Sequence, residues 1–268
     1  MHGPALIDAA YALLLVVVAS VVEYLYFWPR FRADAAADRP GARMRAYRRI
    51  VIGEWAFALA ALAIWRVHAR PWSVLGFASP SGWRAVVGLT IGLAGLGLVT
   101  LQLWSVLRLS PERRVAARPQ LGALGFMLPR TRSELSWFLI VSATAGFCEE
   151  LLYRGYLPWF FAPWLGTAGA MTLAVLIFGI SHIYQGRAGV VKATIAGAVM
   201  AALVLVSGSL VPAMILHGLI DASGGIVGYL LLRDHPTVRP TMPLASPSIG
   251  LAVVEQSLTD DLQRPRSL

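Results

Sequence analysis

The chain has little charge, a single cysteine and a single lysine. Of its 268 residues only 14% are charged and 57% are hydrophobic, whereas about a quarter of the residues of a soluble domain are charged. The lone cysteine, Cys148, excludes an intrachain disulfide and a metal site built from several cysteines. Because no histidine adjoins it, we interpret Cys148 as a small buried side chain rather than a nucleophile. These absences exclude an ordinary soluble domain and indicate an integral membrane protein.

In place of charge, the chain has a series of long apolar runs. A helix needs about 20 apolar residues to span a bilayer, and an open sheet would leave backbone groups unpaired in lipid. We therefore predict an all-α, polytopic membrane protein of about seven transmembrane helices. The predicted spans are residues 5–28, 50–66, 84–105, 135–157, 167–184, 190–207 and 211–232. The first lacks a basic start and is too long for a signal-peptide core, so we expect it to be retained.

The net charge of +9 is explained by membrane topology. Seven arginines lie in the connection 29–49, six lie in 106–134, and four more follow the last span. Connections rich in basic residues stay in the cytoplasm. We therefore predict a multi-pass protein of the cell membrane with its N-terminus outside and its C-terminus in the cytoplasm. Contact with anionic membrane lipid suits these arginines, and no nucleic-acid partner is expected.

Ionisable residues inside the predicted spans gather in the last four. They are Glu149, Glu150 and Arg154 in the fourth span, His182 in the fifth, and His217 and Asp221 in the seventh. Each charge at the bilayer centre costs about 2.5–3.5 kcal/mol, so these side chains are expected to face one another or a water-filled cavity. Two further carboxylates, Glu23 and Glu54, are predicted to lie near helix ends and to reach the membrane interface.

Helical spacing separates the two adjacent glutamates. Glu150 and Arg154 are four residues apart, share a helix face and can pair. Glu149 points about 100° away from that face and has no counter-ion in its own helix. We predict that Glu150 and Arg154 form a structural ion pair and that Glu149 is the general base. An alternative is that all three form one structural ion network.

The histidines also have partners at helical spacing. Phe178 precedes His182 by four residues, and His217 precedes Asp221 by four. A lone histidine in a membrane helix often only bonds a neighbouring helix, but two histidines with acids on neighbouring spans favour a site. Glu149, His182, His217 and Asp221 could instead bind Zn²⁺, although the HExxH motif of many zinc proteases is missing.

At these residues the sequence resembles the CPBP family of CAAX proteases and bacteriocin-processing enzymes, also called Abi. The family signatures EExxxR, FxxxH and HxxxN or HxxxD correspond to "EELLYR" (149–154), "FGISH" (178–182) and "HGLID" (217–221). Each motif alone is weak, but the three in this order are specific. The resemblance covers about residues 135–232, and Asp221 stands where many members have asparagine.

The resemblance implies an intramembrane endopeptidase that hydrolyses a membrane-associated protein or peptide. By similarity, Glu149 activates a water with His182 as its partner, while His217 and Asp221 stabilise the oxyanion or position the substrate. An ionised Asp221 would repel an oxyanion, so we expect it to be neutral or hydrogen-bonded to His217. We prefer a mechanism without a cofactor, with zinc as the alternative.

This resemblance also divides the chain into three predicted regions. Residues 1–134 form an N-terminal three-helix membrane region with basic cytoplasmic loops, residues 135–232 form a catalytic core of four membrane helices, and residues 233–268 form a flexible cytoplasmic tail. Straight, full-length spans would hold Glu149, His182 and His217 at different depths. We therefore expect short or kinked helices, with Pro212 and glycines as kinks, around a cavity open towards the cytoplasmic half.

Two other functions remain open on the sequence alone. A catalytically silent family member would act as a membrane scaffold or immunity protein. A proton-coupled transporter would use membrane Glu, His and Asp side chains to relay protons. Such transporters show paired internal repeats, and none is evident in this chain.

Overall fold

The computed structural model describes residues 4–233, and every regular element within them is a helix. The tail predicted over 233–268 lies outside the described residues beyond Arg233. Five helices are long and apolar enough to cross a membrane: Leu6–Ala36, Ala42–Val67, Trp83–Leu107, Arg132–Ser207 and Val211–Leu232. The predicted all-α membrane fold is confirmed.

The first two helices are longer than their apolar runs. The first comprises α1 (Leu6–Leu13), α2 (Ser20–Val22) and α3 (Trp28–Ala36), joined by the π-helical segments η1 (Leu14–Ala19) and η2 (Glu23–Phe27). A short turn leads into α4 (Ala42–Val67). The arginines of the predicted 29–49 connection thus lie largely on helical turns, because arginine is a good helix former that hydropathy does not detect.

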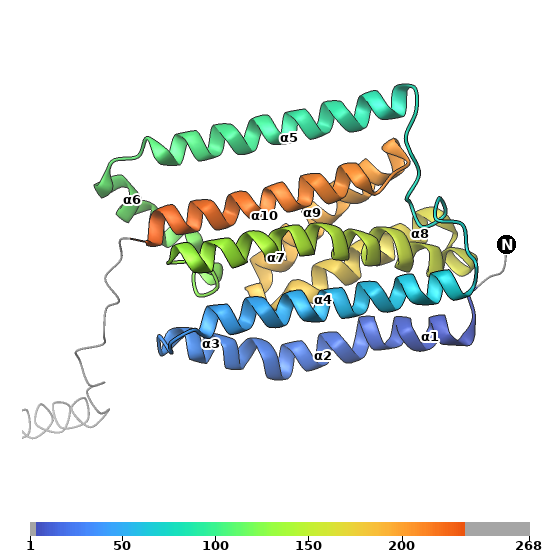
Figure 1. The fold of residues 1–268 in the computed structure, drawn as a ribbon, viewed down its shortest axis with the longest axis horizontal. Coiled ribbons are helices and arrows are strands. Elements are labelled where there is room, and N and C mark those ends of the chain that lie inside the picture. The colour runs from blue at the N-terminus through green and yellow to red at the C-terminus, as the bar shows by residue number, and fades with distance from the viewer. Residues whose placement is uncertain (1–3, 234–268) are drawn as a thin grey trace, which may run out of the picture. The chain divides into compact units, whose positions relative to one another are not determined.

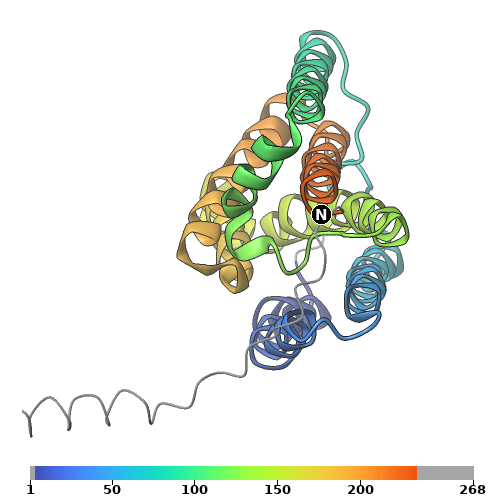
Figure 2. The same cartoon turned by 90° about the vertical axis from the view of Figure 1, so that its left-hand side faces the viewer.

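The helix α5 (Trp83–Leu107) packs on α10 (Val211–Leu232) and α9 (Gly186–Ser207) (Figure 1). Most of its apolar side chains remain exposed, as expected for a helix that faces lipid. The short helices α6 (Pro111–Ala117) and η3 (Arg118–Leu124) then lead back to the bundle. Figure 2, seen end-on, shows α5 beside α10 and α4 beside α7 (Arg132–Glu150).

The long segment Arg132–Ser207 contains three passes rather than one. It consists of α7, the π-helical segment η4 (Leu151–Tyr156), α8 (Leu157–Ser181), the 3₁₀ turn η5 (His182–Gln185) and α9. The chain doubles back at Gly166 and again at Gly186, both of which have positive φ angles that favour glycine. In one continuous helix Tyr153 and Phe178 would be roughly 38 Å apart, whereas their ring centroids are 5.2 Å apart. Because one of the five apolar helices reverses twice, the five together provide about seven passes, as the sequence predicts.

The helices α7 and α10 approach each other closely at Gly146. A Cβ atom added to Gly146 would lie 2.7 Å from the carbonyl oxygen of Met214 and 2.8 Å from the backbone nitrogen of Gly218. The start of α7 is set by Thr131, whose side chain caps the helix together with Glu134. Pro212 lies in the first turn of α10 and begins the helix instead of kinking it.

A buried polar cluster fastens the first helix to the core. Asp8 accepts hydrogen bonds from both Nη atoms of Arg70, at 2.8 and 2.6 Å, and from the hydroxyl of Tyr156 at 2.6 Å. The guanidinium of Arg70 also lies over the ring of Trp159. The described residues, 4–233, belong to one compact unit, and the division at 134/135 stays a prediction about the sequence.

Candidate active site

Glu150 and Arg154 form a buried ion pair at the junction of α7 and η4. Arg154 Nη1 lies 2.9 Å from Glu150 Oε1, and neither side chain is exposed to solvent. The guanidinium also lies over the ring of Phe178, 4.1 Å from its centroid, a favourable cation–π arrangement. Gly197 completes the enclosure, since a Cβ there would meet Arg154 Nη2 at 2.9 Å. Phe178 therefore forms one wall of the pocket that holds Arg154.

The same glutamate also orients a histidine from α10. His217 Nδ1 donates a hydrogen bond of 2.7 Å to Glu150 Oε1, the oxygen that Arg154 contacts. His217 Nε2 is left facing Glu149 Oε2 and Asp221 Oδ2, each 3.7 Å away. Asp221 makes no hydrogen bond to His217, because 3.7 Å from Nε2 is beyond hydrogen-bond distance, and the other expectation, a neutral Asp221, stays a prediction.

Glu149 faces a cavity on a different side of α7. Its side chain is 21% exposed, whereas that of Glu150 is fully buried. The cavity has a volume of about 680 Å³ and is also lined by His182, His217 and Asp221, so all four predicted catalytic residues reach one space. Glu149 Oε2 has no hydrogen-bond partner among the described residues. Helical geometry had placed the two glutamates on different faces, and the structure shows them there.

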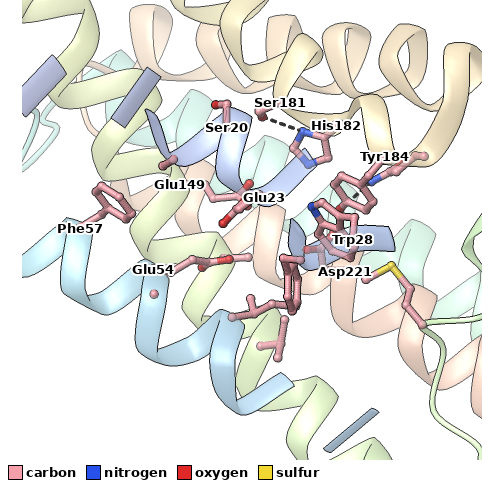
Figure 3. A pocket seen from close by; sticks show the side chains of 18 of the residues that line it. Ser20, Glu23, Trp28, Glu54, Phe57, Glu149, Ser181, His182, Tyr184 and Asp221 are labelled. Carbon is pink, nitrogen blue, oxygen red and sulfur yellow. Dashed lines mark hydrogen bonds between the residues drawn. The ribbon is translucent and has the colours of Figure 1, made fainter. Parts of the chain in front are cut away.

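His182 enters the cavity from the end of α8. Its Nδ1 donates a hydrogen bond of 2.8 Å to the backbone oxygen of Phe178 and lies 3.3 Å from Ser181 Oγ. Because Nδ1 is occupied, Nε2 is the nitrogen left for a ligand in the cavity. Figure 3 shows the His182 ring on the opposite side of the cavity from Glu54, with Glu149 and Glu23 between them.

The length of α8 explains how residues expected at different depths meet. After the break at Gly166 its returning arm covers only residues 167–181, roughly 22 Å of helix. That is shorter than the hydrocarbon core of about 30 Å, so His182 is not carried to the far side. The ring of Phe178 accordingly lies 6.2 Å from that of His217.

Two carboxylates of the N-terminal helices also line this cavity, which sequence reasoning missed. Glu23 lies in η2 and Glu54 lies in the middle of α4, and both belong to the cavity wall (Figure 3). The prediction that they lie near helix ends is wrong, because both helices extend well beyond their apolar runs. The sequence signal that could have identified them is that each is a single carboxylate within an apolar run.

An aromatic stack closes the wall beside His182. The ring of Trp28, at the start of α3, stacks on that of Tyr184 in η5 with centroids 3.5 Å apart. Arg32 also donates a hydrogen bond to the backbone oxygen of Tyr184. The first helix therefore holds the turn that follows His182, although it lies far from that turn in the sequence.

The zinc alternative has no preassembled donor set in this arrangement. Over residues 4–233, no group of three or more His, Cys, Asp or Glu side chains is arranged to hold a metal ion. The Nδ1 atoms of His182 and His217 are engaged with Phe178 and Glu150, which leaves both Nε2 atoms available to a ligand. The four candidate donors share a cavity without converging on one point, and zinc stays the alternative to a mechanism without a cofactor.

Comparison with known proteins finds one family whose match covers this segment of the chain. Residues 131–223 match the family model described as Rce1-like, type II CAAX prenyl endopeptidase. The matched segment contains all three motifs and every predicted catalytic residue. No curated protein and no solved structure matches the chain.

Proposed function

Residues 131–223 make this chain a member of the CPBP/CAAX protease family, and from that premise we propose that it is an intramembrane endopeptidase working through a glutamate-activated water. Its substrate is a membrane-associated protein or peptide. The observation that carries the proposal is Glu149, a carboxylate with an unpartnered oxygen in a cavity. Beside it, the buried pair of Glu150 and Arg154 holds His217 in place.

Glu149 takes a proton from the attacking water as the water oxygen bonds to the scissile carbonyl carbon. His182 assists, because the neutral ring that donates from Nδ1 to Phe178 has an Nε2 lone pair to accept a hydrogen bond from that water. When the tetrahedral intermediate collapses, the C–N bond breaks and Glu149 returns its proton to the departing amine.

His217 and Asp221 act on the substrate side. With three carboxylates around its ring, His217 is assigned a proton on both nitrogens and donates from Nε2 to the developing oxyanion. Asp221 accepts a hydrogen bond from a backbone N–H of the substrate. Glu150 does not contact the substrate and serves to hold the His217 ring.

The test compares cleavage by wild type and Glu149→Gln in liposomes. The substrates are lipid-anchored peptides, with and without an isoprenyl thioether, and products are identified by mass spectrometry. Loss of the base should lower kcat by about 10²–10⁴-fold, whereas Glu112→Gln, an exposed glutamate outside the cavity, should match wild type. Undiminished cleavage by Glu149→Gln would refute the mechanism, and cleavage abolished by a chelator would favour the zinc alternative.

We further propose that the protein is a multi-pass protein of the cell membrane, with its N-terminus outside and the cavity open towards the cytoplasmic side. Arg49 and Met127, which lie in the two arginine-rich connections 29–49 and 106–134, line the cavity. Membrane lipid and a protein or peptide substrate are its proposed partners, and nucleic acid is not.

Topology is testable because the only native cysteine, Cys148, is buried. In intact cells a membrane-impermeant thiol reagent should label Ser79→Cys, between α4 and α5, and leave Ala37→Cys, between α3 and α4, unlabelled until the cells are opened. Both positions are exposed. The reverse pattern would invert the proposed orientation.

A further inference from the structure

A second pair of carboxylates enters the cavity from helices outside the family-matched segment. Glu23 comes from η2 and Glu54 from α4, and both line the cavity with Glu149. Figure 3 shows the three carboxylate groups turned towards the same part of the cavity. The hydrolytic mechanism uses Glu149 and has no role for the other two.

The carboxylates of this part of the cavity have few partners in the protein. The Glu54 side chain is partly buried and interacts electrostatically with Glu149, Asp221 and Glu23. Its Oε2 atom is buried and has no hydrogen-bond partner among the described residues. A buried carboxylate oxygen of this kind is costly to leave unsatisfied, so the orphaned oxygen points to a donor supplied by a ligand of the cavity.

The nearby arginines do not supply that donor. Arg154 is committed to Glu150. Arg49 reaches Glu23 electrostatically, but its guanidinium lies over the ring of Phe27, 4.6 Å from the centroid. No ion pair or hydrogen bond joins a cation to Glu54 within residues 4–233.

We propose that Glu23 and Glu54 form a cation-binding subsite that receives the lysine or arginine side chain of a substrate beside the scissile bond. This inference rests on the proposed peptidase function. An ammonium or guanidinium group would give the Glu54 oxygen a charge-assisted hydrogen bond. Apolar residues of the cavity wall, including Leu15 and Phe57, would cover the aliphatic stem of such a side chain.

The subsite would define substrate choice while Glu149 performs the chemistry. The two N-terminal carboxylates share this part of the cavity with Glu149, so a basic side chain held there would place the neighbouring peptide bond near the catalytic glutamate. A lipid ethanolamine group carries the same ammonium chemistry and is the competing occupant that the experiment must separate.

The experiment uses purified full-length protein in phosphatidylglycerol vesicles and lipid-anchored peptides in matched pairs. Members of a pair differ only by Lys or Gln near the cleaved bond. For wild type, kcat/KM should favour the lysine peptide by about tenfold or more, as expected for one hydrogen bond to a charged group. In Glu54→Gln, which keeps the side-chain volume, that ratio should fall to about threefold or less, and in Glu112→Gln it should stay at the wild-type value.

A cleavage-independent measurement separates this inference from the proposed function. Binding of the same peptide pairs is measured on the inactive Glu149→Gln variant, with and without the added Glu54→Gln change. A lysine preference that Glu54→Gln removes, in the absence of any cleavage by wild type, would support the subsite and reject the peptidase. Cleavage without a lysine preference would overturn the subsite alone. A preference that disappears on adding phosphatidylethanolamine would assign the subsite to a lipid headgroup and overturn the inference.

Discussion

Replacing Gly146 with alanine should move the catalytic-site residues of α7 away from those of α10. Gly146 lies one turn before Glu149 and Glu150 on α7, and it packs against Gly218, the neighbour of His217 on α10. In Gly146→Ala the new Cβ would meet the Met214 carbonyl oxygen at 2.7 Å, where ordinary contact begins at 3.4 Å. All the nearest atoms belong to the backbone of α10, so no side chain can turn aside.

The required retreat of α7 from α10 is about 0.7 Å if the helices move as rigid bodies. The hydrogen bond from His217 to Glu150, now 2.7 Å, would lengthen to about 3.4 Å, beyond the usual range for an N–H···O bond. A displacement approaching 1 Å at a catalytic group lowers the rate on the order of 10²-fold. Stability should change less, because overpacking costs about 1–3 kcal/mol and alanine recovers about 1 kcal/mol of helix propensity.

Two assays measure these effects separately. Peptide cleavage in liposomes gives kcat, and a thiol-reactive dye reports thermal unfolding through exposure of buried Cys148. The control is Gly92→Ala on α5, where a Cβ meets nothing within 4 Å, and its activity should equal that of wild type. If Gly146→Ala and Gly92→Ala both keep the wild-type kcat, the reasoning is refuted. The rigid contact between α7 and α10 would then not be what holds the site together.

Three further substitutions test individual contacts. Arg154→Met leaves the buried Glu150 carboxylate without its cation and should lower the free energy of unfolding by about 3–5 kcal/mol. Adding Glu150→Gln should restore part of that stability, and no recovery would contradict this explanation. Asp8→Asn disrupts the buried pair with Arg70 and should cost on the order of 3 kcal/mol in dye-monitored unfolding, while kcat/KM per folded molecule stays the same. Trp28→Ala removes the stack on the turn after His182 and should raise KM more than it lowers kcat in peptide cleavage; a wild-type KM would show that the stack does not shape the cavity.

Local patterns in the sequence carried much of the prediction. Hydropathy identified a helical membrane protein because apolar length is a property of each segment taken alone. The spacing of four between Glu150 and Arg154 predicted their pairing, and the adjacent Glu149 had to face elsewhere, since both conclusions need only the geometry of one helix. The three motifs placed the candidate catalytic residues within the last four spans. Each of these patterns lies within a single segment of the chain.

The tertiary structure alone decided how those pieces meet. His217 bonds Glu150 rather than Asp221, and the break at Gly166 leaves α8 short enough for His182 to reach the same cavity. Glu23 and Glu54 join that cavity because their helices run past the apolar segments that hydropathy detects. Such contacts depend on the register and depth of one helix against another, which are set by packing at positions such as Gly146 and Gly218. The hydropathy of each helix leaves its rotation and axial position undetermined, so only the packed bundle brings these side chains together.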